Sequence, residues 1–223
     1  DYPDEKKFAE LETNENKVLF VHYDMVQAQV LFISKGEVFN PQLVPYASLF
    51  GEYFGSGLSS ITFQEIREAR ALAYSAFSAF TSPRNDDQSH YVYGYVATQV
   101  DKMEEASEAM LELMNNMPKA PQQFNSAKEA TWKKIETERI IKSSIFWSYE
   151  SAKRRGLDYD IRQDVYRGAK DATLSDMEEF FNNYIKGRTY TFMVIGNRES
   201  VDVDYLKTLG EFQELTLEEV FNY

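Results

Sequence analysis

Hydrophobic residues recur along this chain in two periods, and each period predicts a type of element. Alternating or short apolar runs predict strands at residues 17–23, 27–34, 72–81, 90–99 and 189–195. Steps of three and four residues predict helices at residues 41–54, near 62–70, at 101–117, from 121 to about 155, and at 173–186. A short turn separates the first two strands, so we expect them to form a hairpin-like pair. The long helical region should break at Gly156.

Polar residues at two predicted helix starts fit the capping-box pattern, in which side chains bond the free N–H groups of the first turn. Thr62 with Glu65 and Ser175 with Glu178 have this spacing. Thr173 is a further candidate cap for the late helix.

The order of elements is neither a strand–helix alternation nor all-β. It predicts an α+β fold, a two-layer sandwich in which helices cover one face of a mostly antiparallel mixed sheet. Residues 1–16 are polar and indicate a linker or the tail of a preceding domain, whereas residues 17–223 form the domain. The first residue is not Met, so we interpret the chain as a fragment of a longer protein.

Composition narrows the class of partner. A formal charge of -12 disfavours nucleic acid and anionic membranes. No apolar run approaches the roughly 18 residues of a membrane span. The absence of Cys excludes disulfides and thiolate chemistry. It leaves the compartment open, with the periplasm or cytoplasm of a bacterium as the two candidates.

Two familiar catalytic patterns are missing. The two histidines, His22 and His90, belong to strand-like segments, and neither lies in an H-x-x-E-H or H-E-x-x-H zinc pattern. A pair of distant histidines could still meet in space, but ordinary strand histidines are the simpler interpretation. There is no G-x-S-x-G nucleophile elbow either. We therefore expect no metal and no serine nucleophile in this chain.

The stretch from Gly55 to Ser75 combines local structure signals with reactive side chains. Its turn contains Gly55, Gly57, Ser59 and Ser60 ahead of a short helix. Such a turn can bind a phosphate group with free N–H groups, but it lacks the P-loop lysine. A structural turn capped by Ser59, Ser60 or Thr62 is the plainer alternative.

Arg67 and Tyr74 follow in the same stretch, on either side of the helix-to-strand junction. From the residues alone, Arg67 is a surface charge of the helix. Tyr74 alternates with apolar residues and fits a core aromatic.

The stretch resembles the M16 metallopeptidases, the family of pitrilysin, insulin-degrading enzyme and mitochondrial processing peptidase. The resemblance rests on the glycine turn, the serine pair, a Phe-x-Glu-x-Arg helix and an Ala-Tyr strand. These are Gly55, Gly57, Ser59, Ser60, Phe63, Glu65, Arg67, Ala73, Tyr74 and Ser75. Weaker similarity extends to Gln27, to residues 173–176 and to residues 194–196.

The resemblance implies the inactive C-terminal domain of a zinc protease. In the family, a homologous domain carries the zinc ligands, and the inactive domain faces the metal and contributes an arginine and a tyrosine. By resemblance these are Arg67 and Tyr74. The implied partners are a zinc-bearing M16 domain, in the same chain or another subunit, and an extended peptide substrate. A scaffold or peptide-binding module without proteolytic role is the alternative, because the family also supplies scaffold subunits.

Two positions depart from the family pattern. Ser56 replaces the usual middle glycine of the turn, and Ala71 replaces the usual glycine before Leu-Ala-Tyr. If the chain requires a positive φ at Ala71, alanine is strained there.

Overall fold

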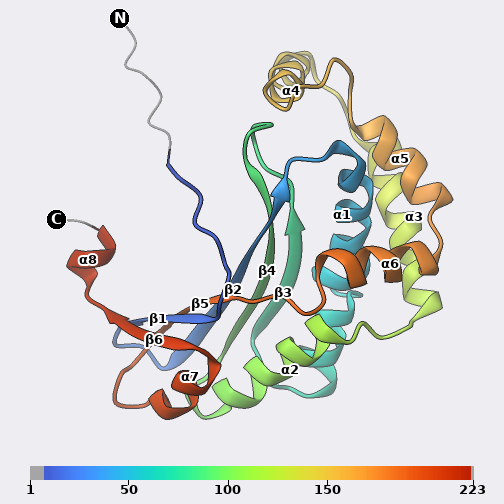
Figure 1. The fold of residues 1–223 in the computed structure, drawn as a ribbon. Helices are drawn as coiled ribbons and strands as arrows, with labels where there is room; N and C mark the ends of the chain where they lie inside the picture. Colours follow the sequence, from blue (N-terminus) through green and yellow to red (C-terminus); the bar gives the residue numbers. More distant parts are fainter. Residues whose placement is uncertain (1–7, 222–223) are drawn as a thin grey trace, which may run out of the picture.

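The computed structural model describes residues 8–221, which form a six-stranded sheet with helices packed on one face (Figure 1). The strand order is β3-β4-β2-β5-β1-β6. Strand β1 runs parallel to β5 and β6, and the other pairings are antiparallel. The predicted α+β two-layer fold with a mixed sheet is confirmed. The strands are β1 Lys17–His22, β2 Gln27–Val38, β3 Ser75–Thr81, β4 Ser89–Gln99, β5 Thr191–Gly196 and β6 Glu211–Leu215.

The expected hairpin of the first two strands is wrong. β5 lies between β1 and β2, where Phe192 stands opposite Val18 on one side and Phe32 on the other. Residues 23–26 can span the two strand spacings of about 4.8 Å each. β5 occupies the gap because its inward side chains, Phe192 and Val194, are each 1% exposed and complete the core.

The main predicted helices at residues 41–54, 101–117 and 173–186 are present. Three helices and one strand near the C-terminal half, α5, α7, α8 and β6, were not predicted. The helices are α1 Val44–Phe50, α2 Met103–Asn115, α3 Pro121–Thr137, α4 Lys142–Arg154, α5 Arg162–Asp171, α6 Leu174–Tyr184, α7 Val203–Leu209 and α8 Leu217–Phe221. Shorter helical turns are η1 Pro41–Leu43, η2 Gly51–Gly55, η3 Phe63–Ala69 and η4 Val100–Lys102, of which η2 and η3 are π-helical.

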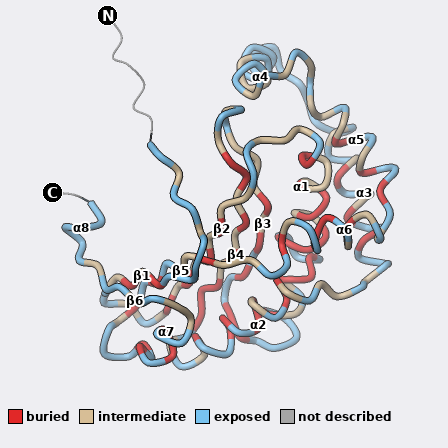
Figure 2. Tube along the Cα trace, in the orientation of Figure 1, coloured by how far each residue is buried: buried red, intermediate tan, exposed pale blue. Residues whose placement is uncertain are grey.

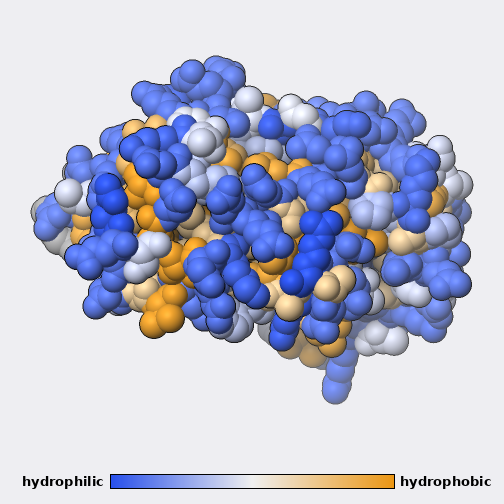
Figure 3. All heavy atoms as spheres, turned by 90° about the horizontal axis from the view of Figure 1, so that it is seen from below, coloured by the Kyte–Doolittle hydropathy of each residue, from blue (hydrophilic) through white to orange (hydrophobic). Residues whose placement is uncertain are grey.

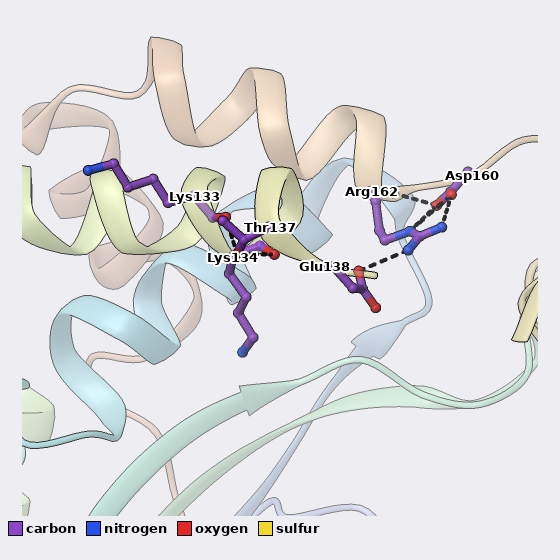
Figure 4. Close-up of polar contacts among 6 residues, drawn as sticks. All are labelled: Lys133, Lys134, Thr137, Glu138, Asp160 and Arg162. Carbon is purple, nitrogen blue, oxygen red and sulfur yellow. Dashed lines mark hydrogen bonds and ion pairs between the residues drawn. The ribbon is translucent and has the colours of Figure 1, made fainter. Parts of the chain in front are cut away.

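The long helix expected from residue 121 to about 155 breaks earlier, between α3 and α4. Glu138 leaves the helical conformation with ψ 122°. Its carboxylate accepts a hydrogen bond of 2.9 Å from Arg162, which also bonds Asp160 (Figure 4). The guanidinium holds the pKa of Asp160 below its usual range. The arginine therefore ties the end of α3 to the start of α5.

The late helix starts with a capping box that lies two residues before the predicted one and is formed by the candidate cap Thr173. The Thr173 side chain accepts from the Asp176 N–H at 3.2 Å, and the Asp176 carboxylate accepts from the Thr173 N–H at 2.8 Å. Ser175 and Glu178 do not form it. Gly187, with φ 72°, follows the helix as expected of a glycine past a helix end.

The hydrophobic core lies between the sheet and the helices α1, α2, α3 and α6 (Figures 1 and 2). Stacked and edge-on aromatic rings fill it, among them Phe50 against Phe54 at 5.0 Å and Phe80 against Phe180 at 5.2 Å. Helix α4 contains no buried residue and projects away from this core (Figure 2). Among residues 8–221, no helix is long and apolar enough to cross a membrane.

The segment before β1 contacts the domain at several places. The Ser89 N–H donates to Glu10 at 3.0 Å, and the Lys35 N–H donates to the Thr13 hydroxyl at 2.9 Å. Asn16 accepts from the Tyr190 N–H at 2.8 Å. Residues 10–16 of the predicted linker thus lie along the sheet, and residues 1–7 are outside the described part.

Candidate functional site

The glycine turn packs against the edge strand of the sheet. A Cβ on Gly55 would lie 2.2 Å from the Ser78 carbonyl oxygen, so only glycine lets η2 approach β3 this closely. Gly57 has φ 101°, a conformation that side chains rarely allow. Both glycines of the stretch therefore have a structural reason.

Ser60 is the residue that caps the short helix. Its buried hydroxyl accepts from the Phe63 N–H at 3.3 Å and donates to the Gly57 carbonyl at 2.9 Å. Ser59 is exposed. The predicted Thr62–Glu65 capping box is wrong, because the Thr62 hydroxyl is buried and lies 3.4 Å from that of Ser78.

The turn favours the structural alternative over a phosphate site. The N–H groups of Ser60, Phe63 and Gln64, which would face an anion, have acceptors within the chain. η3 therefore presents no row of unbonded donors at these positions.

The exit from η3 contains the strained residue that the sequence indicated. Ala71 has φ 49° and is the one non-glycine residue with positive φ in residues 8–221. The next N–H, that of Leu72, donates to the Ile66 carbonyl at 3.0 Å and closes the helix end. The left-handed conformation of Ala71 thus turns the chain from the helix toward β3.

The end of β4 holds the segment that leads from this turn into β3. The Ala97 carbonyl accepts from the Tyr74 N–H at 2.8 Å, and the Thr98 hydroxyl donates to the Leu72 carbonyl. The side-chain amide of Gln99 donates to the Tyr74 hydroxyl at 2.9 Å. Both the backbone and the phenol of Tyr74 are therefore held by one strand.

Arg67 and Tyr74 line the same cavity, with a volume of about 290 Å³. The Arg67 guanidinium lies 4.7 Å from the centre of the Phe63 ring and 3.8 Å from the Glu68 carboxylate. The Arg67 side chain is 46% exposed and Tyr74 is 53% exposed. Tyr74 is therefore not the core aromatic that the alternation allowed, and both side chains can reach a bound molecule.

The cavity lies at the end of the sheet where β3 begins and β4 ends. This end of the molecule carries mostly hydrophilic side chains with separate hydrophobic areas between them (Figure 3). The guanidinium and the phenol that line this cavity are both hydrogen-bond donors of the kind that stabilise carbonyl oxygens or anions, and the phenol oxygen can also accept. The arrangement suits recognition of a peptide carbonyl.

The two histidines have separate structural roles. Buried His90 accepts from the Asn40 N–H at 3.0 Å, and its other ring nitrogen bonds the Thr81 carbonyl at 2.9 Å. Burial lowers the pKa of His90 despite these bonds. His22 accepts from the Arg198 N–H at 3.1 Å. Within residues 8–221, no group of three or more His, Asp or Glu residues is arranged to hold a metal ion.

Sequence reasoning missed two members of the cavity, Gln99 and Lys102. Lys102 donates to the Ala71 carbonyl at 3.1 Å, so it supports the strained turn. Both follow the last inward residue of the predicted strand at 90–99. A polar run that ends a strand next to a candidate site is the signal that could have found them.

Comparison with a protein-family model identifies residues 3–131 as matching the peptidase M16 inactive domain. The match covers more than half of the chain. A comparison of this chain with curated proteins found no match.

Several solved structures have a similar fold at low identity. The peptidase M16 inactive domain from Pseudomonas fluorescens is 14% identical with a TM-score of 0.71, and the match covers 90% of this chain and 48% of that one. A protease from Helicobacter pylori is 17% identical with a TM-score of 0.69, with coverages of 86% and 48%. The ferredoxin protease FusC, solved with Arabidopsis ferredoxin, is 13% identical with a TM-score of 0.64, with coverages of 87% and 21%. The chain spans about half the length of the first two.

Proposed function

The chain belongs to the M16 peptidase family as an inactive domain, and on this premise we propose that it assists a zinc-bearing M16 domain in cleaving peptides. The zinc-bearing domain lies in the same polypeptide or in a partner subunit. Arg67 and Tyr74 bind carbonyl groups of the peptide, and the chain alone hydrolyses nothing. Zinc is required on the partner domain.

The observation that carries the proposal is the common cavity of Arg67 and Tyr74. Two donors that line one cavity can bond peptide carbonyl oxygens, including one that gains negative charge in the tetrahedral intermediate. Neither side chain is buried, and the ion pair of Arg67 with Glu68 at 3.8 Å is long and exposed. A substrate can therefore compete for the guanidinium at little cost.

The edge strand β3 supports the clamping of an extended peptide. It pairs with β4 on one side only and ends the sheet on the other. A peptide added to a sheet edge gains main-chain hydrogen bonds, which give affinity with loose sequence preference. Tyr74 directly precedes this strand, so a peptide along β3 would pass the cavity.

Two apolar surfaces support a contact with another domain. Helix α4 exposes large hydrophobic side chains and borders a groove of about 720 Å³. The sheet face away from the helices exposes Phe77, Met193 and Ile195. Exposed apolar patches of this kind mark interaction sites. The exposed residues of α4 are Ile145, Phe146, Trp147 and Tyr149.

A protein substrate is consistent with what is known of one relative of this fold, since FusC was solved with ferredoxin. The scaffold module remains the alternative function, and the same two apolar surfaces would serve it. The two proposals differ in what Tyr74 does during turnover.

The test uses the full-length enzyme, or this chain together with its zinc-bearing partner, and a fluorescence-quenched peptide that the wild type cleaves. Tyr74→Phe should lower kcat by as much as about 10²–10³ with little change in KM, because the lost donor acts mainly in the transition state. Tyr23→Phe, at an exposed tyrosine outside the cavity, is the control. An unchanged kcat for Tyr74→Phe would remove Tyr74 from the mechanism. If the wild-type assembly cleaves none of a panel of such peptides, the scaffold function is favoured instead.

A further inference from the structure

The phenol of Tyr74 has a side-chain hydrogen-bond partner of its own, separate from the groups that hold the main chain around it. The main chain of the segment is held by backbone and hydroxyl groups of Ala97 and Thr98. Gln99 is different, because its amide nitrogen lies 2.9 Å from the hydroxyl oxygen itself. Of the residues that line the cavity with Tyr74, it is the one hydrogen-bonded to the phenol in the described structure.

From this contact we propose that Gln99 is a positioning residue that holds the Tyr74 phenol toward the peptide carbonyl. The inference rests on the proposed function of Tyr74. Because Tyr74 is 53% exposed, packing restrains its ring only in part. A hydrogen bond from a strand end to the hydroxyl restricts the ring to fewer orientations before the substrate arrives. A donor that is already oriented before the substrate binds needs little reorganisation in the transition state, so more of its hydrogen-bond energy lowers the barrier.

The direction of the hydrogen bond is as important as its presence. A phenol has one O–H donor and an oxygen that accepts. The Gln99 amide donates to the oxygen, so the O–H remains available to donate to the peptide. As the phenol O–H bonds the developing oxyanion, its oxygen becomes a stronger acceptor, and the bond from Gln99 strengthens with it.

The position of Gln99 is itself fixed by the sheet. Gln99 is the last residue of β4 and stands opposite Gln27 of β2 in the antiparallel register. A side chain on a paired strand is held more rigidly than one on a loop. The next element, η4, provides Lys102, which bonds the Ala71 carbonyl. The two ends of the segment from Ala71 to Tyr74 are thus held from the same side.

The test is a double-mutant cycle in the full-length or reconstituted enzyme, with the fluorescence-quenched peptide described above. Gln99→Met keeps the length of the side chain and removes the donor. We expect kcat to fall about 3- to 10-fold, the effect of one hydrogen bond, with KM nearly unchanged. In the Tyr74→Phe background the same change should have no further effect. An equal loss in both backgrounds would overturn the proposal.

A second variant tests the direction of the bond. In Gln99→Glu a carboxylate can only accept, so it takes the phenol O–H and turns it from the substrate. Its kcat should be lower than that of Gln99→Met. The opposite order would refute the assigned direction.

A measurement on the 223-residue chain separates this inference from the function of Tyr74. In ¹⁵N–¹H spectra, the side-chain amide signals of Gln99 should shift in Tyr74→Phe and stay in place in Tyr23→Phe. Unshifted signals would overturn the hydrogen bond whatever the kinetics show. A shift combined with an unchanged kcat for Tyr74→Phe would refute the catalytic role of Tyr74, and the positioning role with it.

Discussion

Replacing Ala71 by glycine should stabilise this protein, although glycine usually destabilises folded chains. Ala71 has φ 49°, and its side chain is exposed. Removing its Cβ loses no buried contact. The hydrogen bond from Lys102 goes to the Ala71 carbonyl, which glycine keeps.

The size of the effect follows from two opposing terms. A non-glycine residue in the left-handed region is disfavoured by roughly 1–2 kcal/mol. The extra freedom of glycine in the unfolded chain costs about 0.5–1 kcal/mol. The difference is a gain of about 0.5–1 kcal/mol in the free energy of unfolding. For a domain of this size, that gain raises Tm by about 1–4 °C.

The assay is urea unfolding followed by tryptophan fluorescence, with Ala69→Gly as the matched control. Ala69 is also exposed and lies in η3, but it has no positive φ. Ala69→Gly should lower the free energy of unfolding by about 0.5–1 kcal/mol. The reasoning is refuted if the two variants lose stability equally, since the left-handed backbone would then cost nothing at Ala71.

Two further predictions concern the turn and the buried histidine. Gly55→Ala should lower the free energy of unfolding in urea by about 1–3 kcal/mol, because its Cβ would lie 2.2 Å from the Ser78 carbonyl oxygen. Gly51→Ala is the control and should lose no stability, because no atom of the surrounding structure lies within 4 Å of its Cβ. Equal losses in the two variants would contradict the packing argument. Burial lowers the pKa of His90 from 6.5, so the unfolded chain binds its proton more readily. The stability that neutral His90 contributes is therefore complete above pH 6.5 and is lost as the pH falls below that value. In urea unfolding from pH 8 to pH 5, the free energy of unfolding should fall less for His90→Gln than for the wild type. Identical pH profiles of the two proteins would disprove the assignment.

The sequence was sufficient to predict the helices with strong periodicity, and the family resemblance pointed to Ala71 as a position of conditional strain. The helix at 101–117 was found because its apolar residues recur at three and four positions and face the sheet as α2. Ala71 was singled out through the family resemblance, because it replaces the usual glycine, and the structure gives it the positive φ for which strain was expected. The helical periodicity is a local signal, and the local conformation agrees with it.

The errors come from contacts between distant residues. Nothing near β1 or β2 shows that Phe192 will pack between Val18 and Phe32. The capping box at Thr62 failed because β3 takes its hydroxyl into the core beside Ser78. α5 was missed although Val165 and Ala169 have helical spacing, because only its contact with α1 and α3 gives that spacing a meaning.

For the candidate site, the sequence indicated Arg67 and Tyr74 through the family resemblance, and the structure places both on one cavity. Their catalytic roles stay predictions. The polar end of the predicted strand was a signal for Gln99, but its hydrogen bond to the Tyr74 hydroxyl depends on the register that brings the end of β4 beside Tyr74.

The place of β5 in the sheet has a consequence during synthesis of the chain. β1 ends at His22, but the strand that joins it to β2 begins at Thr191. At about 5–20 residues per second, the ribosome needs on the order of ten seconds to make the chain between them. Once residue 99 has been made, β2, β4 and β3 can pair, while β1 still has no neighbouring strand and exposes its apolar side chains until β5 is made. Late closure of the sheet around β5 should therefore limit the folding rate and make β1 the segment on which chaperones act first.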